Sequence, residues 1–196
     1  LCLYHELMHV EAWWMAFQNL GYAPPPHLMP ATGHALSPGR LTCAEAEVTL
    51  GSRADEGFVF DNEKWQHQVQ ILAFDIDAAP VSETGFAAFV DAGSYQNRDL
   101  WSDAGWAWRM ASGANHPLYW RKVDGSWQVR RFANWMALHD DAPMLHVNQH
   151  EAEACAAWMQ RRLPGAAQWL HASGQPGFVW GHGWEWTRDA FAPYPG

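Results

Sequence analysis

The chain changes character at residues 21 to 26, and this change divides it into two parts that must fold differently. Residues 1 to 20 contain no glycine or proline, and their apolar side chains recur at helical spacing. Gly21 stands where a helix C-terminal cap belongs, and three prolines follow at 24 to 26. Because proline cannot continue a helix, the sequence predicts one amphipathic helix that ends at about residue 20. Its apolar positions are Leu3, Leu7, Val10, Trp14, Phe17 and Leu20.

Residues 23–45 are rich in Pro, Gly, Ser and His and are predicted to be a linker. Beyond them the pattern is typical of short strands and turns, with helices between. The predicted fold class is therefore α+β, with a helix over 1–22, the linker, and a second domain over 46–196. The strands are predicted at 46–50, 58–60 and 69–76. The helices are predicted at 84–92, with a cap near Ser82, and at 148–161, while 93–138 is predicted to form long loops held by aromatic packing.

Both natural ends of the protein are expected to lie outside this chain. The first residue is not a methionine and falls inside the predicted helix, and Gly196 ends a run typical of turns. We therefore expect residues 1–22 to be the last helix of a truncated bundle and the domain 46–196 to be truncated at its C-terminus.

Composition excludes several classes of protein. Hydrophobic residues make up 48% and charged residues 17% of the chain, which excludes a disordered protein. The net charge of −9 and the lack of basic clusters argue against nucleic acid as a partner. No apolar run reaches the roughly 18 residues that a membrane span requires. Three scattered cysteines do not form a disulfide framework, which favours the cytoplasm.

The chain contains 14 tryptophans, which is unusual for 196 residues. Tryptophan offers a large apolar area and a ring face that attracts cations. The excess therefore indicates either a heavily aromatic core or a pocket for a flat or cationic ligand, and for any single tryptophan the core is the default.

The feature with the clearest chemistry is His5-Glu6-Leu7-Met8-His9-Val10-Glu11 in the first helix. Side chains four residues apart lie one turn above each other, so His5 and His9 can present two imidazole nitrogens to one metal ion. We expect both rings to lie on the helix face toward the second domain.

The same segment matches HExxH, in which two histidines bind zinc and Glu6 would be the general base of a metalloprotease. The metzincin form of that motif requires a glycine and a third histidine downstream. Neither residue occurs at the required spacing after His9, so this form does not apply. A zinc metalloprotease of another type stays an alternative.

Several stretches of the second domain resemble, in order, the formylglycine-generating-enzyme-like domain, which has a C-type-lectin-like fold. Together they cover nearly all of residues 51–196. They are Gly57 to Glu63, Phe74 to Asp77 with Pro80-Val81-Ser82, His146-Val147-Asn148 with Glu151-Ala152, Leu163-Pro164 with Gln168-Trp169, and Trp184 to Thr187 with Pro193 to Gly196.

A helix with HxxxHxE before such a domain resembles the ergothioneine-type sulfoxide synthases, in which a DinB-like helical bundle supplies iron ligands. The resemblance implies a non-haem iron(II), O2-dependent enzyme that joins sulfur or selenium to the imidazole of hercynine. It implies that His5 and His9 are two iron ligands, with a third histidine upstream of Leu1. It also implies a second-shell carboxylate at Glu11.

The resemblance suggests further site residues. Met8 replaces the family's frequent glutamine and is a candidate substrate contact. Trp184, Trp186 and Trp13 are candidate walls for the trimethylammonium group, and Tyr194 is a candidate catalytic tyrosine.

Two features resemble the selenoneine-forming branch: the short segment from His171 to Gly183, and Leu163-Pro164-Gly165-Ala166 in place of Leu-Pro-Thr-Glu. The donor, a thiol or a selenosugar, stays open. The alternatives are a formylglycine-generating-like enzyme, whose paired cysteines would lie beyond Gly196, and a non-catalytic relative that only binds a ligand.

Overall fold

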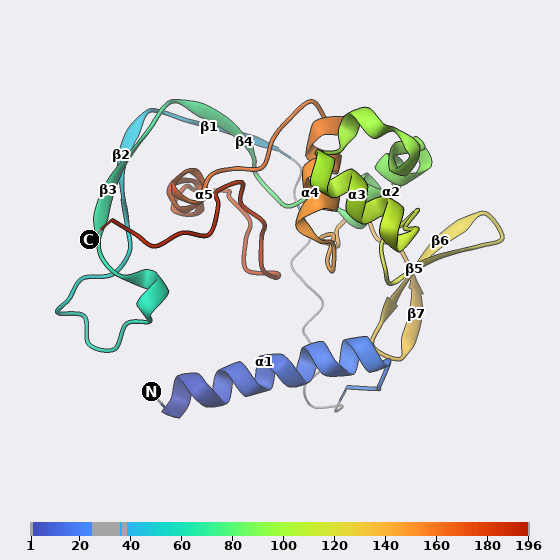
Figure 1. Cartoon of the computed structure of the whole chain (residues 1–196), viewed down its shortest axis with the longest axis horizontal. Coiled ribbons are helices and arrows are strands. Elements are labelled where there is room, and N and C mark those ends of the chain that lie inside the picture. Colours follow the sequence, from blue (N-terminus) through green and yellow to red (C-terminus); the bar gives the residue numbers. More distant parts are fainter. Residues whose placement is uncertain (1, 25–35, 37–38, 196) are drawn as a thin grey trace. The chain divides into compact units, whose positions relative to one another are not determined.

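The computed structural model describes residues 2–24, 36 and 39–195. The described residues form a mixture of helices and strands, which confirms the α+β composition (Figure 1). The helices are α1 (Cys2–Leu20), α2 (Glu83–Asp91), α3 (Asp103–Ser112), α4 (Gln149–Trp158) and α5 (Ala166–Ser173), with short 3-10 helices η2 (Asp61–Glu63), η3 (Ser94–Gln96) and η4 (Arg98–Leu100). The strands are β1 (Arg40–Cys43), β2 (Ala46–Leu50), β3 (His67–Ile71), β4 (Phe74–Asp77), β5 (Trp120–Val123), β6 (Ser126–Arg131) and β7 (Asn134–Ala137).

The chain divides into two compact units, each built from two separate stretches. Unit 1 combines residues 1–35 with 81–158, and unit 2 combines 36–80 with 159–196. The predicted domain boundaries at 22 and 45 stay predictions. The strand β1 falls inside the segment that was predicted to be a linker.

The end of α1 follows the prediction. Gly21 adopts a positive φ of 69°, and its N–H donates to Gln18 O at 3.4 Å. The Tyr22 N–H donates to Phe17 O at 3.0 Å, and the rings of Phe17 and Tyr22 are 6.2 Å apart. These two bonds with their hydrophobic contact form a Schellman motif, which glycine favours because it has no Cβ. Pro25 and Pro26 lie outside the described residues.

Helix α2 begins where the sequence predicted. The Ser82 Oγ accepts the Gly85 N–H at 3.1 Å, which satisfies one of the free donors of the first turn.

Helix α4 begins with a reciprocal cap. The Glu151 N–H donates to Asn148 Oδ1, and the Asn148 N–H donates to Glu151 Oε2, each at 3.0 Å. The helix ends at Trp158, three residues before the predicted end, and Gln160 has a positive φ of 58°.

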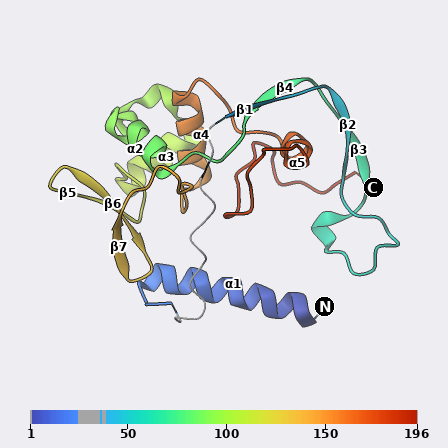
Figure 2. The same ribbon diagram turned by 180° about the vertical axis from the view of Figure 1, so that it is seen from behind.

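The prediction of long loops over 93–138 is wrong. This stretch contains α3 and a three-stranded antiparallel sheet in the order β5-β6-β7 (Figure 2). Asp124 and Gly125 join β5 to β6 with φ values of 49° and 81°. An Asp-Gly pair with two positive φ angles is the preferred two-residue hairpin turn, so the signal for this hairpin was present in the sequence.

The core of unit 1 is aromatic. Tyr95 and Phe89 are fully buried, and their rings are 5.7 Å apart. Trp101 and Trp120 are also buried, at 4% and 3% exposure. The Tyr95 hydroxyl donates to Glu151 Oε1 at 2.6 Å, and burial raises the pKa of this carboxyl. Part of the tryptophan excess is therefore explained by core packing.

Unit 2 contains two antiparallel ribbons, β1-β4 and β2-β3, with α5 packed against them (Figure 2). Its small core joins Val48, Ile71 and Ala167. The predicted strand over 69–76 is divided into β3 and β4, which pair with different strands, and Leu72 between them is 80% exposed. The predicted strand over 58–60 is wrong, since these residues form a loop without strand pairing. The sequence did not predict β1 or α5.

No helix among the described residues is long and apolar enough to cross a membrane. The three cysteines are free, with Cys43 and Cys155 buried and Cys2 exposed. Cys43 and Cys155 thus pack as small apolar residues, as free cysteines in proteins commonly do.

Candidate metal-binding helix and its surroundings

The helix α1 brings His5 and His9 together, as the sequence predicted. Their Nε2 atoms are 2.9 Å apart, and their ring centroids are separated by 4.5 Å at an interplanar angle of 85°. Both side chains are exposed. The pairing follows from the helix geometry, because residues four apart occupy neighbouring turns of one face.

The separation of the two nitrogens fits a shared metal ion. Imidazole nitrogens bind a divalent metal such as zinc at about 2.1 Å, so two nitrogens at adjacent octahedral positions are about 3.0 Å apart. Tetrahedral positions would separate them by about 3.4 Å. The observed 2.9 Å is therefore close to the octahedral value, and it also suits a hydrogen bond between two neutral imidazoles.

A complete metal site is not formed by the described residues alone. No group of three or more His, Cys, Asp or Glu side chains within them is placed to hold a metal ion. The third histidine that was expected upstream of Leu1 stays a prediction.

Glu11 and Met8 differ in their position around the helix. Glu11 follows His9 by two residues, and side chains with this spacing do not face each other on a helix. A direct hydrogen bond from Glu11 to the His9 ring is therefore not favoured by the geometry of α1. Met8 is exposed and lies three residues after His5, on a neighbouring part of the surface.

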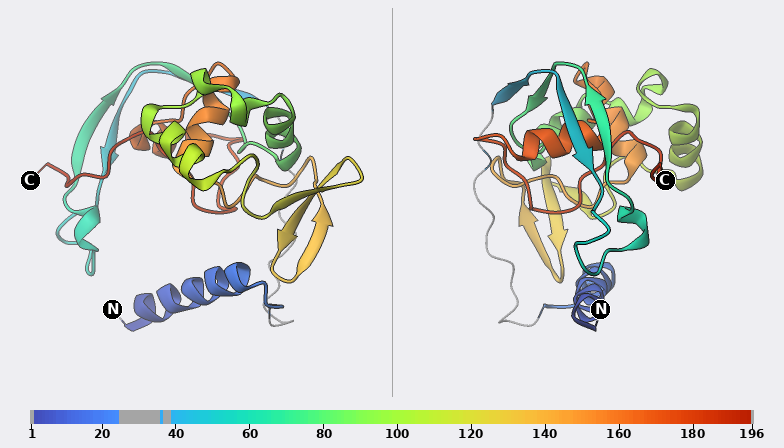
Figure 3. Two further views of the ribbon diagram at one scale, coloured as in Figure 1. Left: turned by 45° about the vertical axis from the view of Figure 1, so that its right-hand side comes forward. Right: turned by 90° about the vertical axis from the view of Figure 1, so that its left-hand side faces the viewer.

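The contacts of α1 with the rest of unit 1 use a different face from the histidines. Trp14 and Gln18 contact the turn between β6 and β7, and the C-terminal end of α1 meets this hairpin in Figure 3. His9 and Gln18 are nine residues apart, which is two and a half turns, so they point to opposite sides. The described contacts of α1 with unit 1 therefore lie on the side of the helix away from His9, and the expectation that both rings face the second domain stays a prediction.

The candidate aromatic walls are exposed to different degrees. Trp184 is 89% exposed, and Trp186 and Trp13 are 46% and 64% exposed. Trp13 belongs to unit 1, whereas Trp184 and Trp186 belong to unit 2. None of these tryptophans belongs to the buried core, and their role in ligand binding stays a prediction.

Tyr194 lies in unit 2 against His67. The two ring centroids are 4.6 Å apart with an edge-to-face angle of 63°, and Tyr194 is half-buried. The Nδ1 of His67 is 3.0 Å from the Trp65 carbonyl oxygen, which orients the imidazole. The Tyr194 ring therefore packs against the His67 ring.

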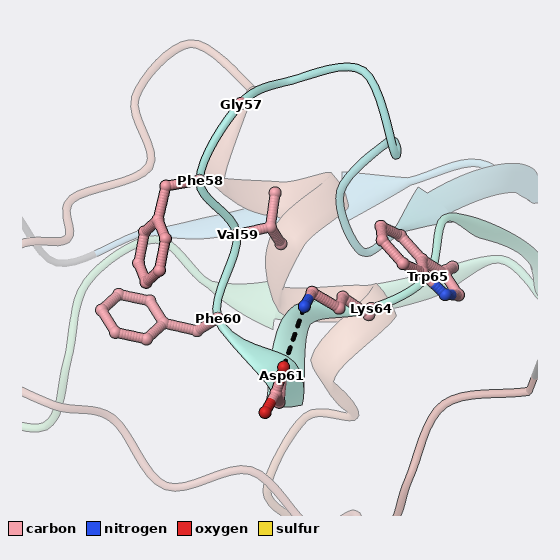
Figure 4. Close-up of a pocket in the computed structure, with 7 residues that line it drawn as sticks. All are labelled: Gly57, Phe58, Val59, Phe60, Asp61, Lys64 and Trp65. Carbon is pink, nitrogen blue, oxygen red and sulfur yellow. Dashed lines mark hydrogen bonds and ion pairs between the residues drawn. The ribbon is translucent and has the colours of Figure 1, made fainter. Parts of the chain in front are cut away.

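A cavity of about 300 Å³ lies in the loop between β2 and β3 of unit 2 (Figure 4). The Lys64 ammonium donates to Asp61 Oδ1 at 2.8 Å and lies 5.3 Å from the ring centre of Trp65. The sequence placed residues 57–63 in a family-like pattern but did not predict the cavity, because the cavity depends on the geometry of the loop. The cavity is lined by Gly57, Phe58, Val59, Phe60, Asp61, Lys64 and Trp65.

Comparison with known proteins identifies relatives along most of the chain. Residues 31–183 match the model of the sulfatase-modifying factor enzyme 1-like domain. A hercynine oxygenase from Mycolicibacterium thermoresistibile is 39% identical over 176 residues, covering 86% of this chain and 38% of the relative. One from Mycolicibacterium smegmatis is 36% identical over 180 residues, covering 88% and 40%.

A formylglycine-generating enzyme from Streptomyces coelicolor is 26% identical over 166 residues, covering 77% of this chain and 53% of that enzyme. The chain thus spans only 38% to 40% of the two hercynine oxygenases. The two histidines of α1 precede the first residue of the domain match.

Proposed function

Because the chain belongs to the family of sulfatase-modifying factor enzyme 1-like domains, we propose that it works in an O2-dependent enzyme that couples hercynine to a sulfur or selenium donor. The two hercynine oxygenases are more similar in sequence than the formylglycine-generating enzyme, at 39% and 36% against 26% identity. The higher identity to the hercynine oxygenases supports a reaction on the imidazole ring of hercynine.

One observation carries the proposal: the 2.9 Å separation between the Nε2 atoms of His5 and His9. This pair lies outside the family match, so the family alone does not account for it. Its spacing suits two adjacent ligands of an octahedral iron(II), completed by a third histidine from a DinB-like bundle upstream. Such a three-ligand site leaves positions for substrate and O2.

The chain's own residues have proposed roles in this reaction. His5 and His9 would hold the metal, which supplies O2 activation when bound. Trp184 and Trp186 would hold the trimethylammonium group of hercynine, with about 0.5–2 kcal/mol per cation–π contact. Met8 would contact the substrate beside the metal, and Tyr194 would donate a proton late in the reaction.

Glu11 is proposed to act on the metal site through another side chain or through its charge, because its position on α1 does not favour direct contact with His9. Its removal should therefore weaken iron binding less than removal of either histidine. A second-shell residue typically changes metal affinity by about 10-fold to 100-fold.

The test is the replacement of His5 or His9 by alanine in the full-length protein. Each variant should lose iron(II) affinity and O2-dependent coupling by more than about 100-fold, because a lost ligand costs more than a lost outer partner. Mass spectrometry of products from hercynine under air, with a thiol and a selenosugar in competition, measures the activity and identifies the donor.

Two controls make the result specific. His139→Ala removes another exposed histidine and should leave coupling unchanged. Glu6→Gln should also leave coupling unchanged. If the protein were instead a zinc metalloprotease, the same substitution would remove the general base and abolish peptide hydrolysis. Full activity in His5→Ala or His9→Ala would refute the proposal, and formylglycine production from a cysteine peptide would favour the formylglycine-generating alternative.

A further inference from the structure

Gln18 is the buried residue of α1, with 4% exposure. Its Nε2 donates to the Arg130 carbonyl at 2.9 Å, and its Oε1 accepts the Phe132 N–H at 2.7 Å. Both ends of one side-chain amide are therefore bonded to the backbone where β6 turns into β7. We name this pair of bonds the Gln18 clamp.

Neighbouring groups hold the same end of the helix. The Arg130 guanidinium donates through Nη2 to the Asn19 carbonyl at 3.4 Å and through Nη1 to the Phe132 carbonyl at 2.8 Å. Carbonyls in the last turn of a helix have no partner within the helix, and a cation there also suits the helix dipole. The Trp14 ring lies 5.3 Å from the Phe132 ring.

The end of α1 and the turn between β6 and β7 lie in close contact. A Cβ added to Gly21 would lie 2.9 Å from Arg130 Nη1, and Gly21 has a positive φ of 69°. Phe132 also has a positive φ, 55°, so the turn presents its N–H to Gln18 in a conformation that few residues adopt. The helix end and the turn are therefore fitted to each other at close range.

The clamp lies far along α1 from the paired histidines. Trp14, Gln18 and Asn19, which contact the β6–β7 turn or its Arg130 side chain, lie in the C-terminal half of the helix. His5 precedes Gln18 by 13 residues, or about 20 Å at 1.5 Å per residue. A tilt of about 5° at the clamp would move the His5 ring by about 1.7 Å, and a misplacement of about 1 Å can cost 100-fold in rate.

We infer that Gln18 is a positioning residue, which holds α1 so that the His5 and His9 rings keep a fixed place relative to unit 1. The inference rests on the proposed function for its effect on turnover, but the clamp itself is a structural feature that can be measured without any substrate. Gln18 lies on the opposite side of α1 from His9, so it would act on the metal site only through the helix.

The experiment uses the full-length protein with Gln18→Met and Gln18→Glu. Methionine has a similar volume but leaves the Arg130 carbonyl and the Phe132 N–H without their partner. Glutamate retains the acceptor for the Phe132 N–H and loses the donor. The matched control is Gln70→Met, which removes an exposed glutamine that bonds across strands to Glu47 at 2.9 Å.

Four quantities are measured below each variant's own melting temperature: amide hydrogen exchange, iron(II) affinity, kcat, and the coupling efficiency, which is the product formed per O2 consumed. For Gln18→Met we expect faster exchange at residues 18–22 and 130–133, iron affinity within about twofold of wild type, and roughly a tenfold fall in kcat and in coupling efficiency. Gln18→Glu should be intermediate, and Gln70→Met should match the wild type.

The outcomes separate this inference from the proposed function. Unchanged exchange in Gln18→Met would overturn the clamp. Faster exchange with unchanged kcat and coupling efficiency would overturn the positioning role. If the wild-type protein does not couple hercynine to a donor, the proposed function fails, and the positioning role fails with it. Faster local exchange in Gln18→Met would still establish the clamp in that case.

Discussion

His146 is a residue whose surroundings disfavour its charged form. Although the residue as a whole is exposed, desolvation by the groups around its ring lowers its pKa, and the nearby charges of Arg131 and Arg130 lower it further. Its ring packs edge-to-face against Tyr119 at 5.2 Å, and its φ of 60° lies in the left-handed region. The folded protein therefore keeps this imidazole neutral at a pH where an unfolded chain would protonate it.

This lowered pKa predicts acid sensitivity. Above about pH 6.5, the ordinary histidine pKa, His146 is neutral in both states and contributes no pH dependence. As the pH falls below that value, the unfolded chain takes up a proton that the folded protein excludes, so the free energy of unfolding falls until the folded-state pKa is reached. His146→Asn, which tolerates a positive φ, should flatten this fall.

The measurement is urea unfolding of wild type and His146→Asn at several pH values between 7 and 5. The matched control, His139→Asn, alters an exposed histidine. An identical pH dependence in wild type and His146→Asn would contradict the prediction.

Single residues differ in how far the sequence predicts their role. The pairing of His5 and His9 needed only an uninterrupted helix, so four-residue spacing was sufficient. Gln18 was missed because glutamine on a helix is ordinarily exposed, and its partners Arg130 and Phe132 lie more than 100 residues away. The available signal was its position four residues after Trp14, on one face of the helix.

At the scale of elements, local signals predicted the ends of helices well. The cap at Ser82 and the stop at Gly21 depend on residues next to the helix, and both are confirmed. The strands β5 to β7 were missed because they are short and carry charged and aromatic side chains on exposed faces. Their pairing is local, in two consecutive hairpins, and the signal for it lay in the Asp124-Gly125 turn rather than in periodicity within one strand.

The cap of α2 provides a prediction for an element. Replacing Ser82 by alanine removes the acceptor of the Gly85 N–H and should lower the free energy of unfolding by about 1 kcal/mol. Urea unfolding checks this value. Ser173→Ala is the matched control, because that hydroxyl donates to Leu170 O at an exposed site. Equal stability of Ser82→Ala and wild type would show that the cap contributes nothing.

At the scale of the whole molecule, segments of the two units alternate along the chain. Residues 1–35 join 81–158, and residues 36–80 join 159–196. The sequence indicated a change near residue 23 from its prolines, but the changes at 80 and 159 fall between ordinary short elements. Such a division follows from packing between distant segments, which composition along the chain does not report.

The last prediction concerns metal binding by the 196-residue chain. Two imidazoles give an incomplete site, and no third ligand group stands with them among the described residues. If the third histidine comes from an upstream helix, as proposed, the chain alone should bind iron(II) at least about 100-fold more weakly than the full-length protein.

Anaerobic titration with iron(II), followed by calorimetry, compares the affinity of the 196-residue chain with that of the full-length protein. The His5→Ala substitution in each of them reports how much of the binding depends on α1. In the chain alone this substitution should change little, because the remaining affinity is already low. In the full-length protein it should remove most of the binding. Tight one-to-one binding by the chain alone, lost in His5→Ala, would mean that these residues complete the site without an upstream histidine.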